Sequence, residues 1–119
     1  MGQLNRRAMA GIQDPNTIDL ITHDNRTDEF AVIMCESRPW GTDPAQIDQL
    51  IAKINSYAAY VLDEGFLVTH PEVSGKSIRI QIDCVDTPDP EAAQVIEQAS
   101  RLLAEYGIAL LVNRLGPTA

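Results

Sequence analysis

The sequence is poor in the residue types and spacings that build common catalytic and cofactor sites. It contains only two cysteines and two histidines, and neither His23 nor His70 stands at metal-ligand spacing from another ligand residue. No serine lies in a Gly-x-Ser-x-Gly turn, and no glycine-rich phosphate loop is present, since residues 75–77 match only the end of one. The sequence therefore predicts no catalytic residue, no metal site and no cofactor.

Positive charge is also scarce. Nine basic residues stand against 17 acidic ones, so the formal net charge is −8 at pH 7. Such a chain repels phosphate backbones and anionic lipid surfaces, which argues against binding to nucleic acid or to a membrane. A protein partner recruited by charge is expected to be basic.

Long apolar runs are absent: the longest span five or six residues, whereas a membrane helix needs about 20. The first eleven residues lack the apolar core of a secretory signal, so we expect a cytoplasmic protein, with Met9 as an alternative start to Met1. In the cytoplasm Cys35 and Cys84 stay reduced and behave as small apolar residues. No disulfide is predicted.

What the sequence does contain suits a single small domain. Its 119 residues are 45% apolar, which is enough to build one hydrophobic core. We expect this domain to span residues 14–115, with flexible tails at 1–13 and 116–119.

The clearest helix signal lies between residues 43 and 65, where apolar residues recur at spacings of three and four. The Asp43 carboxylate can accept hydrogen bonds from the first turn, Pro44 suits that turn, and Gln46 completes a capping box. Gly65 can adopt the left-handed conformation that ends a helix. These features predict a helix with one wide apolar stripe.

A second helix is predicted from the same end signals, with Asp89 and Pro90 at its start and Gly107 after its end. The predicted strands are residues 18–22, 30–36, 77–85 and 108–115, with a hairpin loop at 23–29. Strict alternation in 77–85 indicates one buried and one wet face. The strand at 30–36 is apolar on both parities, as expected for a central strand or for one with a partner on each face.

This order of elements predicts an α/β or α+β two-layer sandwich. A four- or five-stranded mixed sheet carries two helices on one face, because strand-helix-strand crossovers are right-handed. Residues 66–69 follow the helix-ending glycine and are a candidate fifth strand. That strand would make the fold ferredoxin-like.

The face of the sheet away from the helices is predicted to be partly apolar. It would carry Arg79, Gln81 and Asp83 from the alternating strand. Beside them it would carry Leu111, either Leu20 or Ile21, and either Ile33 or its neighbours Val32 and Met34. An apolar strip on an uncovered sheet usually marks an interface, so we expect a homodimer formed through this face or through an edge strand.

The carboxyl ends of the parallel strands are the best place to look for a small-ligand site. They supply Arg38, the single tryptophan Trp40, and Asp86, with Asn55 and His70 contributing if loops fold over them. These polar residues also have structural interpretations. Capping explains the aspartates at the helix starts, and residues off the helix stripe, such as Lys53, are interpreted as solvated.

An ordered set of landmarks gives the chain a resemblance to a known family. The landmarks are Asp14-Pro15-Asn16-Thr17-Ile18-Asp19, Trp40, Lys53-Ile54-Asn55-x-Tyr57, Gly65, Pro71 and Gly75-Lys76. In this respect the sequence resembles a family of small bacterial domains of unknown function. The resemblance covers residues 14–115, but this chain has only Gly41, Thr42 and Asp43 where the family pattern is richer in acidic residues and histidine. It implies no activity.

Charge, size and the lack of catalytic motifs favour a non-enzymatic protein-interaction or accessory module that acts as a homodimer. The alternative function is a small-ligand-binding domain with its site near Trp40. A hydrolytic enzyme with paired carboxylates ranks last.

Overall fold

A computed structural model describes residues 11–115 of the chain. Residues 1–10 of the predicted tail at 1–13, with Met1 and Met9, and the predicted tail at 116–119 lie outside the described residues. The elements in chain order are β1 (Leu20–Asp24), β2 (Glu29–Glu36), α2 (Gln46–Leu62), α3 (Gly65–Thr69), the 3-10 turn η1 (Pro71–Val73), β3 (Ser77–Cys84), α4 (Pro90–Ala104) and β4 (Ala109–Arg114). Within residues 11–115 no helix is long and apolar enough to cross a membrane.

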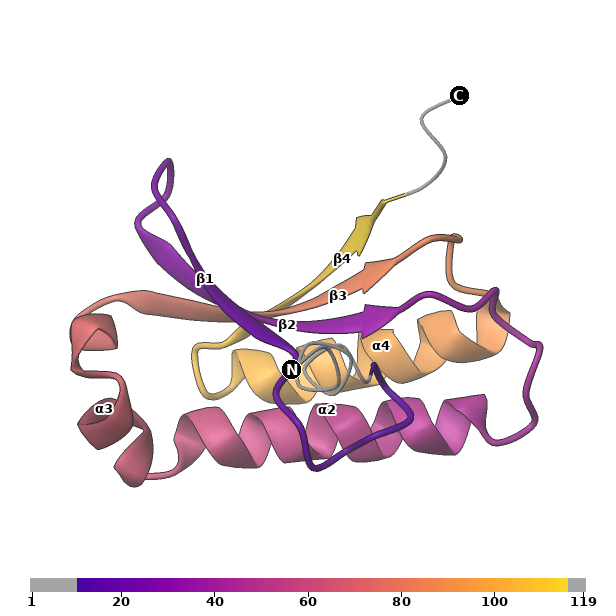
Figure 1. Cartoon of the computed structure of the whole chain (residues 1–119), viewed down its shortest axis with the longest axis horizontal. Coiled ribbons are helices and arrows are strands. Elements are labelled where there is room, and N and C mark those ends of the chain that lie inside the picture. Colours follow the sequence, from indigo (N-terminus) through magenta and orange to yellow (C-terminus); the bar gives the residue numbers. More distant parts are fainter. Residues whose placement is uncertain (1–10, 116–119) are drawn as a thin grey trace, which may run out of the picture.

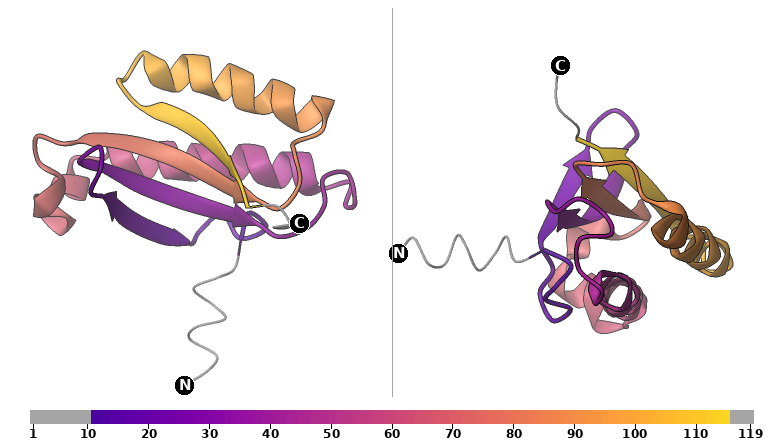
Figure 2. Two further views of the ribbon diagram at one scale, coloured as in Figure 1. Left: turned by 90° about the horizontal axis from the view of Figure 1, so that it is seen from above. Right: turned by 90° about the vertical axis from the view of Figure 1, so that its right-hand side faces the viewer.

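The four strands form one mixed sheet in the order β1-β2-β3-β4 (Figure 1). β1 pairs antiparallel with β2, and β2, β3 and β4 run parallel to one another. Both long helices, α2 and α4, lie on the same side of the sheet (Figure 2). The predicted mixed sheet with two helices on one face is therefore confirmed, and the sheet has four strands in the described residues.

The segment at 66–69 is helical, so it is not a fifth strand. Gly65 does not end α2 either: it opens α3 and lacks the left-handed φ that the predicted cap requires. α2 ends instead at Asp63, whose backbone is extended. The ferredoxin-like alternative rested on that fifth strand and loses its support.

The two helix starts differ. At α4 the prediction is confirmed, because the Asp89 carboxylate accepts from the Ala92 backbone N–H at 2.9 Å and Pro90 occupies the first turn. At α2, the Asp43 carboxylate accepts from the Ala45 N–H at 2.9 Å, so it closes a turn ahead of the helix. Gln46 forms no capping box, since its amide turns inward to other partners.

The core lies between the sheet and the two helices. Val32, Met34, Ile80 and Ile82 are fully buried on the helix side of the sheet. Ile12 is also fully buried, and its backbone N–H donates to the Cys35 carbonyl at 3.1 Å. The packed chain therefore includes a residue that the predicted tail at 1–13 would have left out.

Candidate functional site

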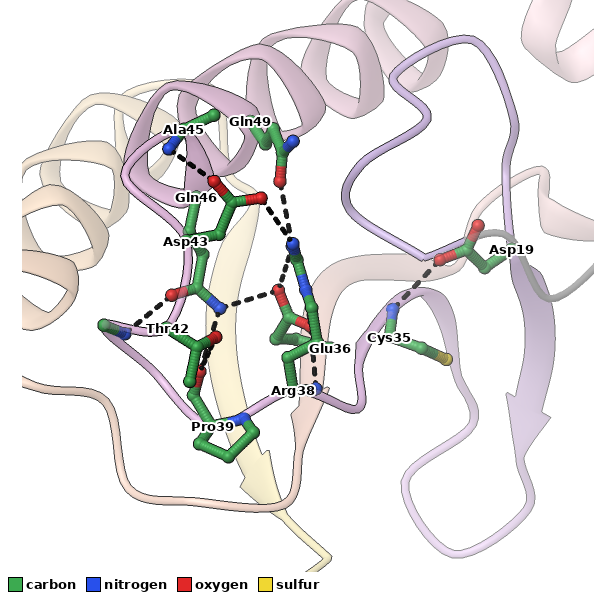
Figure 3. A network of polar contacts seen from close by, with 11 residues as sticks. Asp19, Cys35, Glu36, Arg38, Pro39, Thr42, Asp43, Ala45, Gln46 and Gln49 are labelled. Atoms are coloured by element: carbon green, nitrogen blue, oxygen red, sulfur yellow. Dashed lines mark hydrogen bonds and ion pairs between the residues drawn. The ribbon is translucent and has the colours of Figure 1, made fainter.

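The predicted strand-end site is occupied by a polar network centred on Glu36, the last residue of β2 (Figure 3). The Glu36 side chain is 1% exposed and accepts from the Arg38 backbone N–H and Nε at 2.9 Å, and from its Nη2 at 2.7 Å. Burial alone would raise the pKa of Glu36, but the hydrogen bonds from Arg38 and Gln46 and the charge of Arg38 outweigh it. The pKa of Glu36 is therefore lowered from its ordinary value.

The rest of this network fixes the loop between β2 and α2. The Gln46 amide nitrogen donates to Glu36 at 3.0 Å, and its oxygen accepts from the Gly41 N–H at 2.7 Å. Arg38 also donates to the Asp43 carboxylate at 3.2 Å and to the Gln49 amide oxygen at 2.8 Å. Within residues 11–115 no buried side-chain nitrogen or oxygen lacks a partner, so the network satisfies itself.

The other predicted ligand-binding residues are only partly brought together. Trp40 lies at the same end of the sheet as Arg38, and its indole N–H donates to the backbone carbonyl of Asp86 at 3.1 Å. Asn55 is exposed on α2, and within the described residues no hydrogen bond joins its side chain to a loop. α3 lies at the opposite end of the molecule (Figure 1), and His70 directly follows it. The Nε2 of His70 is 2.6 Å from the Tyr60 hydroxyl.

The sequence places His23 in a hairpin loop, and this prediction is wrong because His23 lies within β1. Its Nε2 contacts the Asp28 carboxylate at 2.8 Å across the turn. In the part of the chain that the structure describes, no group of three or more His, Cys, Asp or Glu side chains could hold a metal ion.

The prediction that Lys53 is solvated is wrong. Lys53 is completely buried. Its Nζ donates to the backbone carbonyls of Asp14 at 2.5 Å and Thr17 at 2.6 Å, and to the Asp19 carboxylate at 3.0 Å. These three acceptors replace water around the ammonium group. The spacing of Lys53 could have predicted its burial. It lies three residues after Leu50 and four before Tyr57, which places it on the buried stripe of α2.

Tyr57 extends this buried polar cluster to the sheet. Its hydroxyl donates to the Ile33 carbonyl at 2.7 Å and accepts from the Asp19 N–H at 2.9 Å. The Asp19 carboxylate also accepts from the Cys35 N–H at 3.0 Å. Burial raises the pKa of the Tyr57 phenol, which therefore stays protonated. The cluster ties the loop before β1 to α2 and β2, and it uses all three N–H donors of the Lys53 ammonium group.

The uncovered face of the sheet, here called the open face, carries a row of residues that the strand register aligns. Leu20 pairs with Ile33, Ile33 with Gln81, and Gln81 with Leu111. Residues that pair across strands share a face, so these four side chains form one line across all four strands. We call it the apolar band. The register thus selects Leu20 and Ile33 from the alternatives that the sequence left open.

The ends of the apolar band are accessible, and its middle is not. Leu20 and Leu111 are 44% and 46% exposed, whereas Ile33 is buried between them. Gln81 is also buried. The exposed apolar surface of the open face is therefore concentrated on β1 and β4, the two edge strands.

Polar residues flank the apolar band on both sides. On one side Arg79 donates from Nη1 to Glu29 at 3.0 Å and from Nη2 to Asp24 at 3.4 Å. On the other side one oxygen of Asp83, Oδ1, accepts from Gln81 at 2.8 Å and from Asn113 at 3.1 Å. An apolar centre with a polar rim is the usual anatomy of a protein interface.

The strand directions make this exposure unusual. Sheets built from parallel strands are normally covered on both faces, because helical crossovers and neighbouring elements bury them. Here β2, β3 and β4 are parallel, yet the long helices cover one face only (Figure 2). The open face is therefore the candidate binding surface of this domain.

A second apolar surface lies beside β4 on the helix side. A groove of about 480 Å³ separates α4 from β4, and the two elements diverge toward the carboxyl end of the strand (Figure 1). Ala93, Ile96, Leu110 and Val112 line it, together with the ion pair between Glu97 and Arg101. The groove extends the apolar character of the β4 edge.

The comparisons with known proteins give a family and no activity. No curated protein and no solved structure matches the chain. A family model covers all of the residues that the structure describes. As the resemblance predicted, the chain belongs to a family of unknown function, DUF6572, whose model matches residues 10–115.

Proposed function

We propose that this chain is a non-enzymatic protein-interaction module that acts as a homodimer through the open face of its sheet. The observation that carries the proposal is the apolar band, which crosses three parallel strands on a face that no described element covers. A second copy placed on this face would bury Leu20 and Leu111.

Charge supports contact at this face. Two chains with a net charge of −8 repel each other, so they can associate only where acidic groups are scarce or paired. On the open face Asp24 and Glu29 share one cation, Arg79, and Asp83 forms hydrogen bonds with the side-chain amides of Gln81 and Asn113. A basic protein partner is a separate prediction from the net charge and would meet the acidic surface elsewhere.

The alternative function, a small-ligand site near Trp40, has less support. Arg38 and Glu36 form hydrogen bonds with each other, and Arg38 also donates to Gln49 of α2. Asp86 offers Trp40 its backbone carbonyl. These contacts explain the residues near Trp40 as groups that hold the loop between β2 and α2 in place.

Sedimentation velocity over a range of protein concentrations tests the proposed function. We expect a species of twice the 13.1 kDa chain mass in the wild type and a monomer in Leu111→Asp. Leu102→Asp is the matched control, because Leu102 is 64% exposed on α4 and lies outside the open face. A wild-type chain that remains monomeric at the highest soluble concentration would overturn the proposal.

A further inference from the structure

We propose that a cavity between α2 and the loop before β1 binds a small organic cation with an aromatic body. The cavity has a volume of about 530 Å³, which is in the size range of small-molecule sites. Its walls are formed by Ser56, Ala59 and Tyr60 of α2, by Asp63 at the end of α2, and by Pro15, Asn16 and Ile18 of the loop. The cavity lies apart from the open face, so this inference is independent of the proposed function.

The loop wall of the cavity is held in place by buried groups. The Lys53 ammonium group donates to the backbone carbonyls of Asp14 and Thr17, which flank Pro15 and Asn16 in the chain. The Asp14 carboxylate accepts from the Asn16 N–H at 3.0 Å and from the Thr17 hydroxyl at 2.7 Å. Figure 1 shows this loop crossing α2. Because the wall is fixed before binding, a ligand has little chain to order.

The helix wall is fixed as well. The Tyr60 hydroxyl lies 2.6 Å from Nε2 of His70, and its ring packs edge-on against Phe66 with the ring centroids 5.2 Å apart. Ser56 and Tyr60 are four residues apart and share a face of α2. Seven residues of helix rise about 10 Å, which is the separation along the axis between Ser56 and Asp63. The cavity therefore suits an elongated molecule.

The polar side chains of this cavity differ from those of the buried networks. Within residues 11–115 no hydrogen bond or ion pair of the structure involves the Asp63 carboxylate, the Ser56 hydroxyl or the side-chain amide of Asn16. Glu36 and Lys53, by contrast, make all their contacts inside the protein. The polar groups of the cavity wall are therefore available to a ligand.

Charge at the Asp63 end of the cavity selects a cation. α2 ends at Asp63, and its last turn carries no basic residue. The negative end of the helix dipole and the Asp63 carboxylate therefore act in the same direction. Glu64 follows directly in the chain and adds a second acidic group. An ammonium group is favoured at this end, whereas a carboxylate or a phosphate is repelled.

The middle of the cavity selects an apolar, aromatic body. Pro15, Ile18 and Ala59 line it together with the ring of Tyr60. An aromatic ring packs well against such a wall, and an ammonium group close to a tyrosine ring gains cation–π attraction. The chemistry of the walls thus describes an arylalkylamine.

Three probes of similar size test the charge requirement. Phenethylamine, 2-phenylethanol and phenylacetate carry a positive, a neutral and a negative end group on the same ring. We expect saturable changes in the amide NMR signals of the wall residues with phenethylamine, at least about tenfold weaker binding of 2-phenylethanol, and no binding of phenylacetate. Equal affinities for the amine and the alcohol would overturn the cation site. No saturable change with any probe, or changes confined to residues outside the cavity walls, would overturn the cavity as a binding site.

A substitution at Asp63 separates this site from general attraction to an acidic chain. Asp63→Asn keeps the size of the side chain and should weaken phenethylamine binding by at least about tenfold, with little effect on 2-phenylethanol. Glu64→Gln is the matched control, because it removes one charge from the neighbouring residue, which does not line the cavity. It should weaken phenethylamine binding by less than about threefold. Equal losses in the two variants would contradict a site at Asp63.

Filling the cavity provides a test that does not depend on charge. Ala59→Leu places a larger side chain in the wall and should weaken phenethylamine binding by at least about tenfold. Ala104→Leu, at an exposed position on α4, is the control and should leave binding unchanged. Leucine is a good helix former, and circular dichroism verifies that both variants are folded. Unchanged phenethylamine binding in Ala59→Leu would overturn the inference, while the sedimentation result would still decide the proposed function.

Discussion

The two faces of the sheet are built from the same four strands but lie in different environments. On the helix-covered face Val32, Met34 and Ile82 are completely buried. On the open face the apolar band ends in two leucines that are almost half exposed. The difference lies in what covers each face, because the open face also carries apolar residues at Ala31 and Ile33. A strand that is apolar on both parities predicts a central strand or one covered on both faces. β2 is central in the sheet, and Ala31 and Ile33 are buried although no described helix lies over them.

The covered side also hides the strongest polar interactions. Lys53, Asp19 and Tyr57 form a buried cluster under β1 and β2, whereas the ion pairs of Arg79 on the open face remain partly accessible. The covered face should therefore determine folding stability, and the open face should determine association. The following predictions test that division.

The largest expected effect is on the covered side. Lys53→Met should lower the free energy of unfolding by about 3–5 kcal/mol, because it leaves the buried Asp19 carboxylate without its partner. Urea denaturation measures the change. Lys76→Met is the surface control: Lys76 pairs with exposed Asp28, and its loss should cost at most about 1 kcal/mol. Equal losses for the two lysines would contradict the prediction.

A pair of alanine substitutions compares the faces directly. Ile80→Ala removes a side chain that is completely buried against the helices and should cost about 3 kcal/mol of stability. Leu111→Ala on the open face should cost less than about 1 kcal/mol when measured at concentrations where the chain is monomeric. The order reverses for association, which Leu111→Ala should weaken more. If Leu111→Ala destabilises the monomer as much as Ile80→Ala does, the division between the faces fails.

Tyr57→Phe tests the link between the buried cluster and the sheet. The substitution removes a hydroxyl that serves the Ile33 carbonyl and the Asp19 N–H, so we expect a loss of about 1–3 kcal/mol in unfolding free energy. Tyr106→Phe, at a tyrosine that is 66% exposed, should change stability by less than about 0.5 kcal/mol. Thermal and urea unfolding should rank the two variants alike.

The smallest effects concern acid stability. The folded-state pKa of Glu36, on the covered face, lies below its ordinary value of 4.5. Its contribution to stability is therefore complete above that value and is lost as the pH falls through the folded-state pKa. Glu36→Gln should flatten this acid limb of the stability profile.

Asp24 on the open face provides the comparison. Its pKa is also lowered, first by the hydrogen bond from the Arg26 backbone N–H. Solvent reaches this carboxylate more than it reaches Glu36, so Asp24→Asn should flatten the acid limb less than Glu36→Gln does. Denaturant midpoints measured from neutral pH into the acid range separate the two, and a larger effect of Asp24→Asn would contradict the comparison.

Much of this fold could be predicted from local sequence. The Asp89-Pro90 start and the Gly107 end of α4 follow from capping chemistry that acts within a few residues. The strict alternation of apolar and polar residues in β3 predicts which of its side chains lie on the open face, without any information on strand pairing. The choice between Leu20 and Ile21, however, depends on strand register, which is a non-local property.

The errors have a common physical cause. Gly65 has the freedom to cap a helix, but the chain continues into α3 and Phe66 is buried, so packing outweighs the local preference. Lys53 and Gln46 appear polar in the sequence, yet both lie on the buried stripe of α2 because the fold supplies them with acceptors and donors. Tertiary partners for polar groups cannot be inferred from a one-dimensional pattern of polarity.

The order of the strands has a consequence for how the molecule is made. Each strand pairs with the strand before it in sequence, so a chain emerging from the ribosome can add each strand to a sheet already present. β4 is the last of the four, and it brings Leu111, one of the two exposed leucines of the apolar band. An unfinished chain thus lacks one end of the contact surface.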